Sequence, residues 1–545
     1  MSNGWYIGVS GFIIVTIKSN VKKELIVMIW NRKTRYTPYE QWPATKLPQL
    51  VAQARQSKWR MQHHIQPTSG LLNDPCGFSY FDGQWHLFYQ VFPFGPVHGL
   101  KSWQHVTSKN LVDWHDEGLA IRPDTPYDSH GAYTGTALPI DDQLFIMYTG
   151  NVRTADWQRE SYQLGAWMDT DNHIKKLSRP LIAHAPAGYT SSFRDPDLIR
   201  TDHGYYALIG AQTTTEIGAI LVYFSKDLTT WTCQGELNVP ANARGYMIEC
   251  PNLVWIDQQP VLLFCPQGLS QATIPYQNIY PNIYLVADQL DLAQAQFTEP
   301  HALTQLDDGF DVYATQAINA PDGRALAVSW IGLPEISYPT DRENWAHCLS
   351  LVKELTLKDG HLYQNPVAAV DDLRTTAHDL VFEQQRATVA ALNGNFELLL
   401  TVPADKTVTV NIADQQESGQ LQVTVDANHG QVMIDRRHTG NSFAEDYGQT
   451  RQVELTAHKT IKIRLIIDVS VFECYIDNGY SVMTGRFFLN ATPSRLNVQG
   501  DTTAVTGKVW EWRQSEHTRV DNNETKIKWC CEASGGLSDN RFSGY

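Results

Sequence analysis

The chain has 545 residues, and 43 Lys and Arg against 58 Asp and Glu give it a formal net charge of −15. Hydrophobic residues at 42% and charged residues at 19% are ordinary globular values, which exclude wholesale disorder, collagen and coiled coil. An acidic chain without a cluster of Lys and Arg is a poor candidate for binding nucleic acid or an anionic membrane.

The N-terminal region, residues 1–58, is predicted to be an extension ahead of the first folded domain. Residues 1–28 are apolar and then rich in Lys, without a clear periodicity, so we expect them to be foreign to the fold or disordered. The apolar run at 7–17 is far shorter than the roughly 20 residues that span a bilayer, and it lacks the flanks of a signal peptide. Most of the eight Cys are scattered singly, which favours a reducing compartment and predicts a cytoplasmic protein.

A repeat runs through residues 59–365. Five segments share one pattern, in which a short apolar strand, a turn containing Asp and a second apolar strand follow one another. The turns lie 55 to 65 residues apart, and SKNLVDW at 108–114 is echoed by SKDLTTW at 225–231. Recurring units of this length are typical of propeller blades, although unrelated hairpins in a large β protein are the alternative. The turn aspartates are Asp82, Asp141, Asp202, Asp257 and Asp322.

The pattern changes in residues 366–513, where alternating stretches at 420–425, 460–468 and 470–476 predict an antiparallel β-sandwich. This part holds no constellation of acids, so packing or a homodimer contact is its expected role. Residues 514–545 are polar and are expected to be a disordered tail. The predicted fold class is therefore all-β, with a five-bladed β-propeller catalytic domain followed by a C-terminal β-sandwich.

Three acids occupy equivalent places in the repeat. Asp74 and Glu249 each lie 8 residues before a turn aspartate, and Asp195 lies 7 before one; Tyr133 takes the corresponding place in the second unit. Equivalent strand ends of a propeller converge around its axis, so the three acids are expected to face one funnel. Each is followed within two residues by Pro, which fixes the backbone there. A single Asp-Pro is more often a turn device, but three at equivalent positions favour a site.

Paired carboxylates are the usual machinery of glycoside hydrolysis, one as nucleophile or base and the other as proton donor. Crowding of three acids should raise the pKa of at least one of them, as a general acid at neutral pH requires. A non-catalytic propeller that binds protein or carbohydrate is the alternative from another class, and it has no need of these acids.

No metal or cofactor is predicted, because the sequence holds neither an H-E-x-x-H motif nor a close Cys and His cluster. The abundant His are expected to be hydrogen-bonding residues. Trp114 and Trp231 belong to the repeated echo and are expected in blade cores, whereas the residues alone leave Trp103 open between core and sugar contact.

The chain resembles glycoside hydrolase family 32, the β-fructofuranosidases or invertases, and within it the bacterial branch that hydrolyses sucrose 6-phosphate. The resemblance covers about residues 59–513 and implies the same propeller and sandwich. It rests on LLNDPCG at 71–77, FYQ at 88–90, KSWQHVTSKNLVDW at 101–114, AYTGTAL at 132–138, FRDPDLIR at 193–200, YMIECPNL at 246–253, GFDVYATQ at 309–316 and PTDRENWAHCLSL at 339–351.

The resemblance also implies residue roles. Asp74 would be the nucleophile, Glu249 the general acid and base, and Asp195 the group that binds the fructose hydroxyls, with retained configuration. Retention in turn implies carboxyl groups of Asp74 and Glu249 about 5–5.5 Å apart. Arg194 is expected to keep the carboxylate of Asp195 ionised. Residues matching the family's fructosyl pocket are Asn73, Gln90, Trp103, Tyr133, Thr134, Arg194, Cys250 and Tyr313.

Several positions depart from the family pattern. Cys76 replaces a common Asn, while Phe92 and His98 alter the side of the site that holds the leaving group. Sucrose, sucrose 6-phosphate and short fructo-oligosaccharides remain open as substrates, and so does transfer of the fructosyl unit to sugar instead of water. A phosphate contact has five candidates, among which the sequence does not choose: Lys101, Arg122, Arg153, Arg159 and Arg244.

Overall fold

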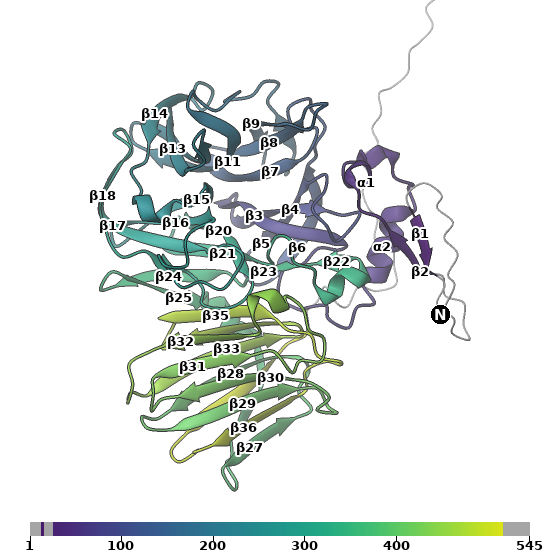
Figure 1. Ribbon diagram of the computed structural model, residues 1–545, viewed down its shortest axis with the longest axis vertical. Coiled ribbons are helices and arrows are strands. Elements are labelled where there is room, and N and C mark those ends of the chain that lie inside the picture. Colours follow the sequence, from purple (N-terminus) through teal and green to yellow (C-terminus); the bar gives the residue numbers. More distant parts are fainter. Residues whose placement is uncertain (1–11, 16–24, 516–545) are drawn as a thin grey trace, which may run out of the picture.

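The computed structural model describes residues 12–15 and 25–515, which form two β-rich bodies stacked end to end (Figure 1). The upper body is built from residues of the predicted propeller and the lower body from residues of the predicted sandwich. Most of the N-terminal stretch 1–28 and nearly all of the tail 514–545, expected to be disordered, lie outside the described residues.

The upper body is a five-bladed propeller, as predicted from the repeat. Each blade is an antiparallel sheet whose first two strands flank one of the five turns that the sequence marks with Asp. The blades are β3 (Gly70–Phe81), β4 (Gln84–Phe92), β5 (Ser102–Ser108) and β6 (Trp114–Ile121); β7 (Ala132–Ile140), β8 (Gln143–Arg153), β9 (Arg159–Met168) and β10 (Ile174–Lys176); β11 (Tyr189–Thr201), β12 (Gly204–Thr213), β13 (Gly218–Ser225) and β14 (Thr232–Glu236); β15 (Met247–Ile256), β16 (Gln259–Gln267), β17 (Ile283–Asp291) and β18 (Gln296–Pro300), with β19 (Thr304–Gln305); and β20 (Val312–Asn319), β21 (Ala325–Ile331), β24 (Lys353–Lys358) and β25 (His361–Pro366), with β23 (Cys348–Leu349).

The ring of blades is closed between the last blade and the first. β22 (Trp345–Ala346), which follows β21 in the chain, pairs parallel with the start of β3 at Gly70 and Leu71. The inner strands β3, β7, β11, β15 and β20 contact one another in order, and β20 returns to β3. Their starting ends therefore surround one axis, as the repeat predicts.

Each inner strand breaks its pairing at the same place. A β-bulge interrupts the register after Leu72 in β3, after Ala132 in β7, after Arg194 in β11, after Glu249 in β15 and after Tyr313 in β20. A bulge turns side chains out of the regular alternation and is a common device next to active sites. Three of the bulges contain or end at a Pro, which has no amide hydrogen to lose from the sheet: Pro196 and Pro251 lie within their bulges, and Pro75 is the first paired residue after its bulge.

The lower body is a sandwich of two six-stranded antiparallel sheets, as predicted. Alternating apolar residues of both sheets meet in one core that includes Phe396, Val410, Val423 and Ile463. One sheet contains β26 (Arg374–Asp379), β28 (Asn395–Val402), β33 (Ile461–Asp468), β34 (Val471–Ile476), β35 (Ser481–Arg486) and β37 (Thr506–Trp512); the other contains β27 (Arg386–Ala390), β29 (Thr407–Ala413), β30 (Gln420–Asp426), β31 (Gln431–Asp435), β32 (Thr450–Glu454) and β36 (Arg495–Gly500).

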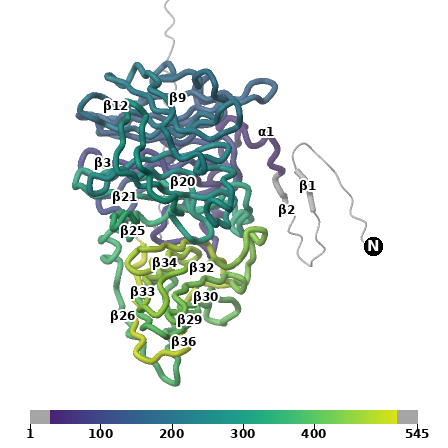
Figure 2. Tube along the Cα trace, turned by 60° about the vertical axis from the view of Figure 1, so that its left-hand side comes forward, coloured from purple at the N-terminus to yellow at the C-terminus, as the bar shows by residue number. Residues whose placement is uncertain are grey.

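The N-terminal segment lies beside the first two blades (Figures 1 and 2). Trp30 packs edge-on against Phe92, and Trp42 stacks on Phe94 with ring centroids 4.8 Å apart. The helices of the described residues are short, and none is long and apolar enough to cross a membrane. They are α1 (Arg32–Arg35), α2 (Lys46–Ala54) and the 3-10 turns η1 (Tyr39–Gln41), η2 (Ala241–Ala243), η3 (Pro339–Glu343), η4 (Ala368–Leu373) and η5 (Glu445–Tyr447); β1 (Phe12–Val15) and β2 (Leu25–Met28) form a separate pair.

Candidate active site

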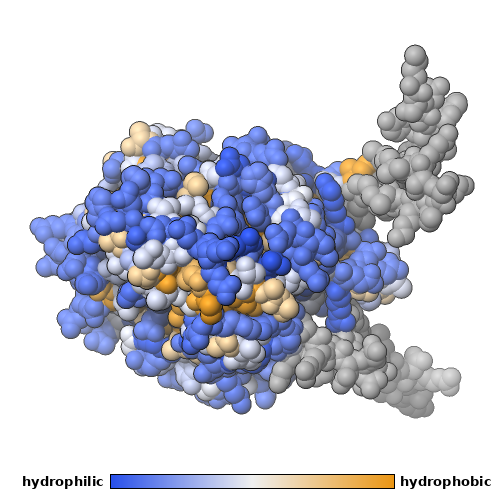
Figure 3. Space-filling view, turned by 90° about the horizontal axis from the view of Figure 1, so that it is seen from below, coloured by the Kyte–Doolittle hydropathy of each residue, from blue (hydrophilic) through white to orange (hydrophobic). Residues whose placement is uncertain are grey.

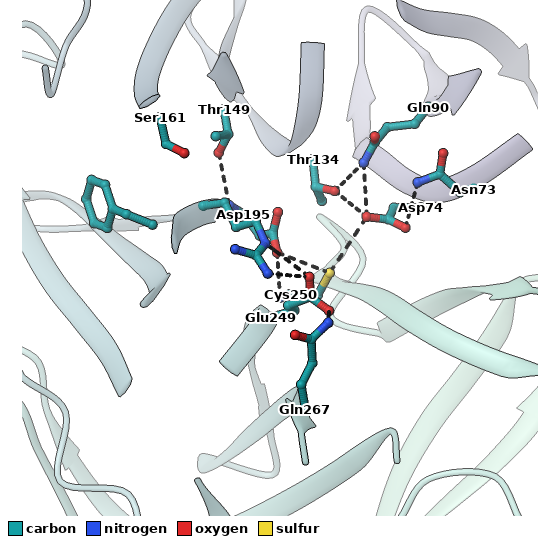
Figure 4. A network of polar contacts seen from close by, with 12 residues as sticks. Asn73, Asp74, Gln90, Thr134, Thr149, Ser161, Asp195, Glu249, Cys250 and Gln267 are labelled. Carbon is teal, nitrogen blue, oxygen red and sulfur yellow. Dashed lines mark hydrogen bonds and ion pairs between the residues drawn. The ribbon is translucent and has the colours of Figure 1, made fainter. Parts of the chain in front are cut away.

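Asp74 lies at the bulge of β3 with both carboxylate oxygens engaged (Figure 4). Asn73 donates its side-chain amide to Oδ1 at 2.9 Å. Gln90, across the hairpin on β4, donates to Oδ2 at 3.0 Å, and the Thr134 hydroxyl from the next blade donates to the same oxygen. These donors fix the orientation of the carboxylate.

Asp195 lies at the bulge of β11 in a left-handed backbone conformation, with φ of 66°. Its amide donates to the Thr149 hydroxyl at 3.0 Å, and its Oδ2 accepts the Cys250 amide at 3.1 Å. Burial raises the pKa of Asp195 to about 7, and the negative charges of Glu249 and Asp74 act in the same direction. Crowding among the three acids thus raises one pKa, as the sequence predicts, and the affected group is Asp195.

Glu249 lies at the bulge of β15 and is surrounded by donors. Arg194 contacts Oε1 at 2.7 Å, while Gln267 and the Tyr313 hydroxyl each donate to Oε2 at 2.7 Å. Burial alone would raise the pKa of Glu249, but Arg194 and Tyr313 outweigh burial and hold that pKa below its ordinary value. Before a ligand binds, Glu249 is therefore a carboxylate.

Cys250 joins the three acids into one cluster. Its thiol lies 4.0 Å from Oδ2 of Asp74 and 3.6 Å from Oδ2 of Asp195, and its own chain neighbour is Glu249. Figure 4 shows all four side chains turned toward the same space from strands of three blades. Convergence of the acids, expected from the repeat alone, is thus present in the structure.

Arg194 acts on two of the acids. It was expected to keep Asp195 ionised, and its charge, with Nε 4.0 Å from Oδ2 of Asp195, does lower the pKa of that group, although burial outweighs it. Its two hydrogen bonds go to Glu249, which the sequence did not indicate.

The remaining predicted pocket residues divide into two groups. Asn73, Gln90, Thr134, Cys250 and Tyr313 contact one or more of the acids, as described. Trp103, in contrast, has no exposed surface, and its indole nitrogen donates to the carbonyl oxygen of Tyr133 at 3.0 Å. Trp103 therefore holds the backbone of Tyr133 from within the blade core. Trp114 and Trp231 are half-buried against blade cores, in line with their predicted role.

Sequence reasoning missed three contributors. Thr149 and Gln267 stand near the ends of the second strands of their blades, where they reach Asp195 and Glu249 respectively. The hairpin register was the available signal for Gln267, because β16 pairs back onto β15 across a turn that the sequence reveals. The third contributor is Tyr36, which follows α1, and no comparable signal in the sequence indicates it. Tyr36 lies so close to Tyr133 that the phenol of Tyr133 raises the pKa of Tyr36.

One group of side chains among the described residues has the spacing of a metal site. Asp169, Asp171 and His173 have ligand atoms within 4.8 Å of one another. They occupy the exposed turn between β9 and β10, at the far end of β9 from Arg159. The group is therefore separate from the three acids.

Comparison with known families assigns both the propeller and the sandwich to domains of one family. The model described as "Glycosyl hydrolases family 32 N-terminal domain" matches residues 64–366, and "Glycosyl hydrolases family 32 C terminal" matches residues 369–511.

Individual relatives agree with the family models. The chain is 99% identical over 501 residues to a sucrose-6-phosphate hydrolase of Pediococcus pentosaceus, covering 92% of this chain and 100% of that protein. It is 43% identical to the sucrose-6-phosphate hydrolase of Streptococcus mutans over 84% of this chain and 94% of that one.

Solved structures show the same fold. The sucrose-6-phosphate hydrolase from Lactobacillus gasseri superposes with a TM-score of 0.86 at 44% identity, covering 89% of this chain and 100% of that one. A variant of a family 32 β-fructofuranosidase of Bombyx mori, solved in complex with sucrose, gives a TM-score of 0.76 at 29% identity over 87% of this chain and 99% of that one.

Proposed function

The chain belongs to glycoside hydrolase family 32, and from that premise we propose that it hydrolyses the fructosyl bond of sucrose and of sucrose 6-phosphate, releasing fructose. The observation that carries the proposal is the convergence of Asp74, Asp195 and Glu249 around the Cys250 thiol. The names of the bacterial relatives support the phosphorylated substrate.

In the first half-reaction, a carboxylate oxygen of Asp74 attacks the anomeric carbon of the fructosyl unit. The bond from that carbon to the glycosidic oxygen breaks, and Glu249 gives its proton to the departing oxygen. An ester between Asp74 and the fructosyl unit results. Asp195 binds the fructosyl hydroxyls and keeps the ring in place during the attack.

In the second half-reaction, Glu249 takes a proton from water, and the water oxygen attacks the same carbon from the side that the leaving group vacated. The ester bond breaks, fructose leaves with retained configuration, and Asp74 is again a carboxylate. The contacts of Arg194, Tyr313 and Gln267 stabilise the charged form of Glu249, which is the form that this base step needs.

The first half-reaction needs a proton on Glu249, which its surroundings disfavour in the free enzyme. Asp195, with a pKa raised to about 7, is the acid of the cluster that holds a proton near neutrality. Because the three acids interact, their protonation belongs to the cluster as a whole. The pH profile of the free enzyme therefore reports the cluster and not one isolated carboxyl group.

The experiment that tests this function compares kcat/KM for sucrose and sucrose 6-phosphate and follows the released fructose by NMR. The proposal predicts hydrolysis of both, with the β-anomer of fructose appearing first because configuration is retained. Hydrolysis of neither substrate, or first appearance of the inverted anomer, would refute it. A distance between the carboxyl groups of Asp74 and Glu249 of about 5–5.5 Å in a crystal structure stays a prediction of the retaining mechanism.

Two alternatives from the sequence share the same residues. Fructosyl transfer would show as oligosaccharide products at high sucrose, and a preference for short fructo-oligosaccharides would show as a higher kcat/KM on them. A non-catalytic carbohydrate-binding propeller predicts neither hydrolysis nor transfer.

A cytoplasmic location and a homodimer formed through the sandwich also stay proposals. Seen from the sandwich end, the surface is mostly hydrophilic, with a band of more hydrophobic residues across it (Figure 3). Cell fractionation would test the location, and size-exclusion chromatography with light scattering would test the dimer.

A further inference from the structure

The N-terminal segment around Tyr36, which lies outside the repeat, forms part of the edge of the site; we call this edge the rim. Tyr36, directly after α1, packs against His130 and Trp157 with ring centroids 5.6 and 5.2 Å away. Burial, followed by the neighbouring phenol of Tyr133, raises the pKa of Tyr36 to about 12. The N-terminal segment thus reaches the second blade at Tyr133, which stands at the bulge of an inner strand.

The position of Tyr36 is fixed by the first blade. The carbonyl oxygen of Arg35 accepts the Leu100 amide at 2.8 Å, and the Tyr39 hydroxyl donates to the Leu100 carbonyl at 2.9 Å. Trp30 packs on Phe92, one of the residues that departs from the family pattern. The rim is therefore built into the fold before any ligand arrives.

Positive charge gathers around Tyr133. The ammonium of Lys101 lies 5.3 Å from the centre of the Tyr133 ring, although Lys101 is only 7% exposed. Arg159 is close enough to Tyr133, Arg153 and Glu249 for their charges to influence its pKa, which burial lowers first of all. Arg153 faces the Trp157 ring at 5.9 Å.

None of these three cations forms a salt bridge among the described residues, although the charge of Glu249 acts on Arg159. Lys101, Arg153 and Arg159 form no ion pair there, and Nε of Arg153 is buried without a hydrogen-bond acceptor. Lys101 is buried and both arginines are half-buried. A positive charge that is largely removed from water without a salt-bridge partner is costly, and a bound ligand that supplies negative charge offsets this cost. A phosphate group accepts several such hydrogen bonds at once.

The other two phosphate candidates from the sequence are engaged elsewhere. Arg244 pairs with Glu236 at 2.5 Å and donates to the Val239 carbonyl at 3.1 Å. Arg122 lines a separate hollow with Pro38 and Asp124. The structure therefore favours Lys101, Arg153 and Arg159 over Arg244 and Arg122 as phosphate contacts, a choice that the sequence left open.

The location of the cations relates them to the leaving group. Arg153 and Arg159 are cross-strand partners at the adjoining ends of β8 and β9. Lys101 lies over Tyr133 at the bulge of the inner strand β7. Arg159 is also close enough to Glu249, the proposed proton donor to the departing oxygen, for their charges to interact, which relates these cations to the leaving group. We propose that Lys101, Arg153 and Arg159, walled by Tyr36, form a subsite for a phosphate ester on the leaving group of the substrate. This inference rests on the proposed hydrolysis of sucrose 6-phosphate and adds the residues that recognise its phosphate.

The test measures discrimination between the two substrates, as the ratio of kcat/KM for sucrose 6-phosphate to kcat/KM for sucrose. Losing one charge-assisted hydrogen bond to the phosphate should lower this ratio about 10- to 100-fold in Arg153→Gln and in Arg159→Gln. Arg153→Lys, which keeps the charge, should recover part of the loss. Arg324→Gln is the matched control, because Arg324 pairs with Asp322 at the opposite end of a blade.

A binding measurement separates the phosphate ester from free phosphate. Isothermal titration of the wild-type protein should show glucose 6-phosphate binding at least about tenfold tighter than glucose, and the difference should shrink in Arg153→Gln. Inorganic phosphate should compete with glucose 6-phosphate but bind more weakly. Equal binding of glucose and glucose 6-phosphate, or a substrate ratio within twofold of wild type in both variants, would overturn the subsite. Hydrolysis of neither substrate by the wild type would instead refute the function on which it rests.

Discussion

The guanidinium of Arg194 hydrogen-bonds to Glu249, from the next blade, through two nitrogens at 2.7 and 3.0 Å, whereas Asp195, its neighbour in the chain, lies 4.0 Å away. Arg194 lowers the pKa of both acids, but it outweighs burial, with the help of Tyr313, only at Glu249. The two carboxyl groups of one site thus differ in protonation because one arginine contacts them at different distances. Separation of this kind is how a site assigns acid and base roles at one pH.

The Tyr313 hydroxyl contributes to the low pKa of Glu249, so Tyr313→Phe should raise that pKa. A general acid acts in its protonated form, and activity falls as pH rises through its pKa. The alkaline limb of the kcat/KM profile, which reports the protonation of the cluster that includes Glu249, should therefore move to higher pH, by up to about one pH unit for one hydrogen bond to a charged group.

Tyr280→Phe is the control for this prediction. Tyr280 packs on the Tyr313 ring at 6.1 Å, but its hydroxyl contacts Tyr246 at 3.0 Å and not Glu249. An unmoved limb in Tyr313→Phe, or an equal movement in both variants, would contradict the role given to the Tyr313 hydroxyl.

A buried histidine fastens the segment before the first blade to the sandwich. His64 lies between Asp468 at 2.9 Å and Glu473 at 3.2 Å, with no exposed side-chain surface on any of the three. Burial alone would lower the pKa of His64, but the two carboxylates outweigh burial and raise it to about 9. The stabilisation is complete below the ordinary His pKa of about 6.5 and is lost as pH rises through about 9.

We therefore expect the melting temperature to fall as pH rises from about 6.5 to above 9. Because it leaves two buried acids without their partner, His64→Gln should cost about 3–5 kcal/mol at pH 6 and flatten this dependence. Thermal unfolding of both proteins across this pH range measures the effect. Parallel curves for the two proteins would show that His64 does not carry the charge assigned to it.

Two thiols lie close to the nucleophile but should be unreactive. Burial raises the pKa of Cys76 and of Cys250 well above the ordinary value, and the charge of Asp74 or Asp195 adds to burial. Since the thiolate is the reactive form, iodoacetamide at about pH 7.5 should leave both unmodified in the native protein. Half-buried Cys233 should react before them.

Peptide mapping by mass spectrometry after timed alkylation measures the order of reaction, and the denatured protein serves as the fully reactive reference. Rapid modification of Cys250 with loss of activity would show that its thiol is accessible and ionised.

The sandwich holds a loop at the edge of the site. Arg451, on β32, donates to the side chains of Gln277 at 2.8 Å and Asn278 at 3.1 Å and to the Gly309 carbonyl at 3.0 Å. Two residues further, Tyr280 packs on Tyr313, the partner of Glu249.

Arg451→Lys keeps the charge but loses the fork, so it should raise KM about 3- to 10-fold with a smaller effect on kcat. Arg437→Gln is the control, because Arg437 pairs with Asp435 in its own body and its side chain is 59% exposed. Steady-state kinetics on both variants measures this effect. A loss of stability with an unchanged KM would show that Arg451 stabilises the fold and does not position the loop for substrate binding.

The architecture and the acids could be predicted because they repeat. Asp82 and Asp257 mark equivalent turns, so counting back from them locates Asp74 and Glu249 without any knowledge of contacts. The alternating pattern of 420–425 likewise corresponds to β30 of the sandwich.

What could not be predicted depends on the direction of side chains and on contacts without a repeat. Adjacency in the chain suggested Asp195 as the partner of Arg194, and the two do form an ion pair at 4.0 Å, but the closer partner at 2.7 Å is Glu249 from the next blade, which adjacency could not reveal. The residues alone leave Trp103 open between core and sugar contact, and the family resemblance suggests the pocket; in the structure it is fully buried in a core cluster with Phe88 and Tyr148. Tyr36 reaches Tyr133 across nearly a hundred residues through packing of the N-terminal segment, which leaves no periodic signal.

The most direct test of the central claim is release of fructose from sucrose 6-phosphate by the wild type, by Asp74→Asn and by Asp197→Asn. Asp197 is a matched control, since it is buried on the same strand as Asp195, has a pKa raised by burial to about 8 and accepts the Leu253 amide. We predict that Asp74→Asn loses at least about a thousandfold in rate because the nucleophile is gone, whereas Asp197→Asn stays within a few-fold of wild type. Full activity of Asp74→Asn, or none in the wild type, would contradict the assignment of the three converging acids as the hydrolytic site.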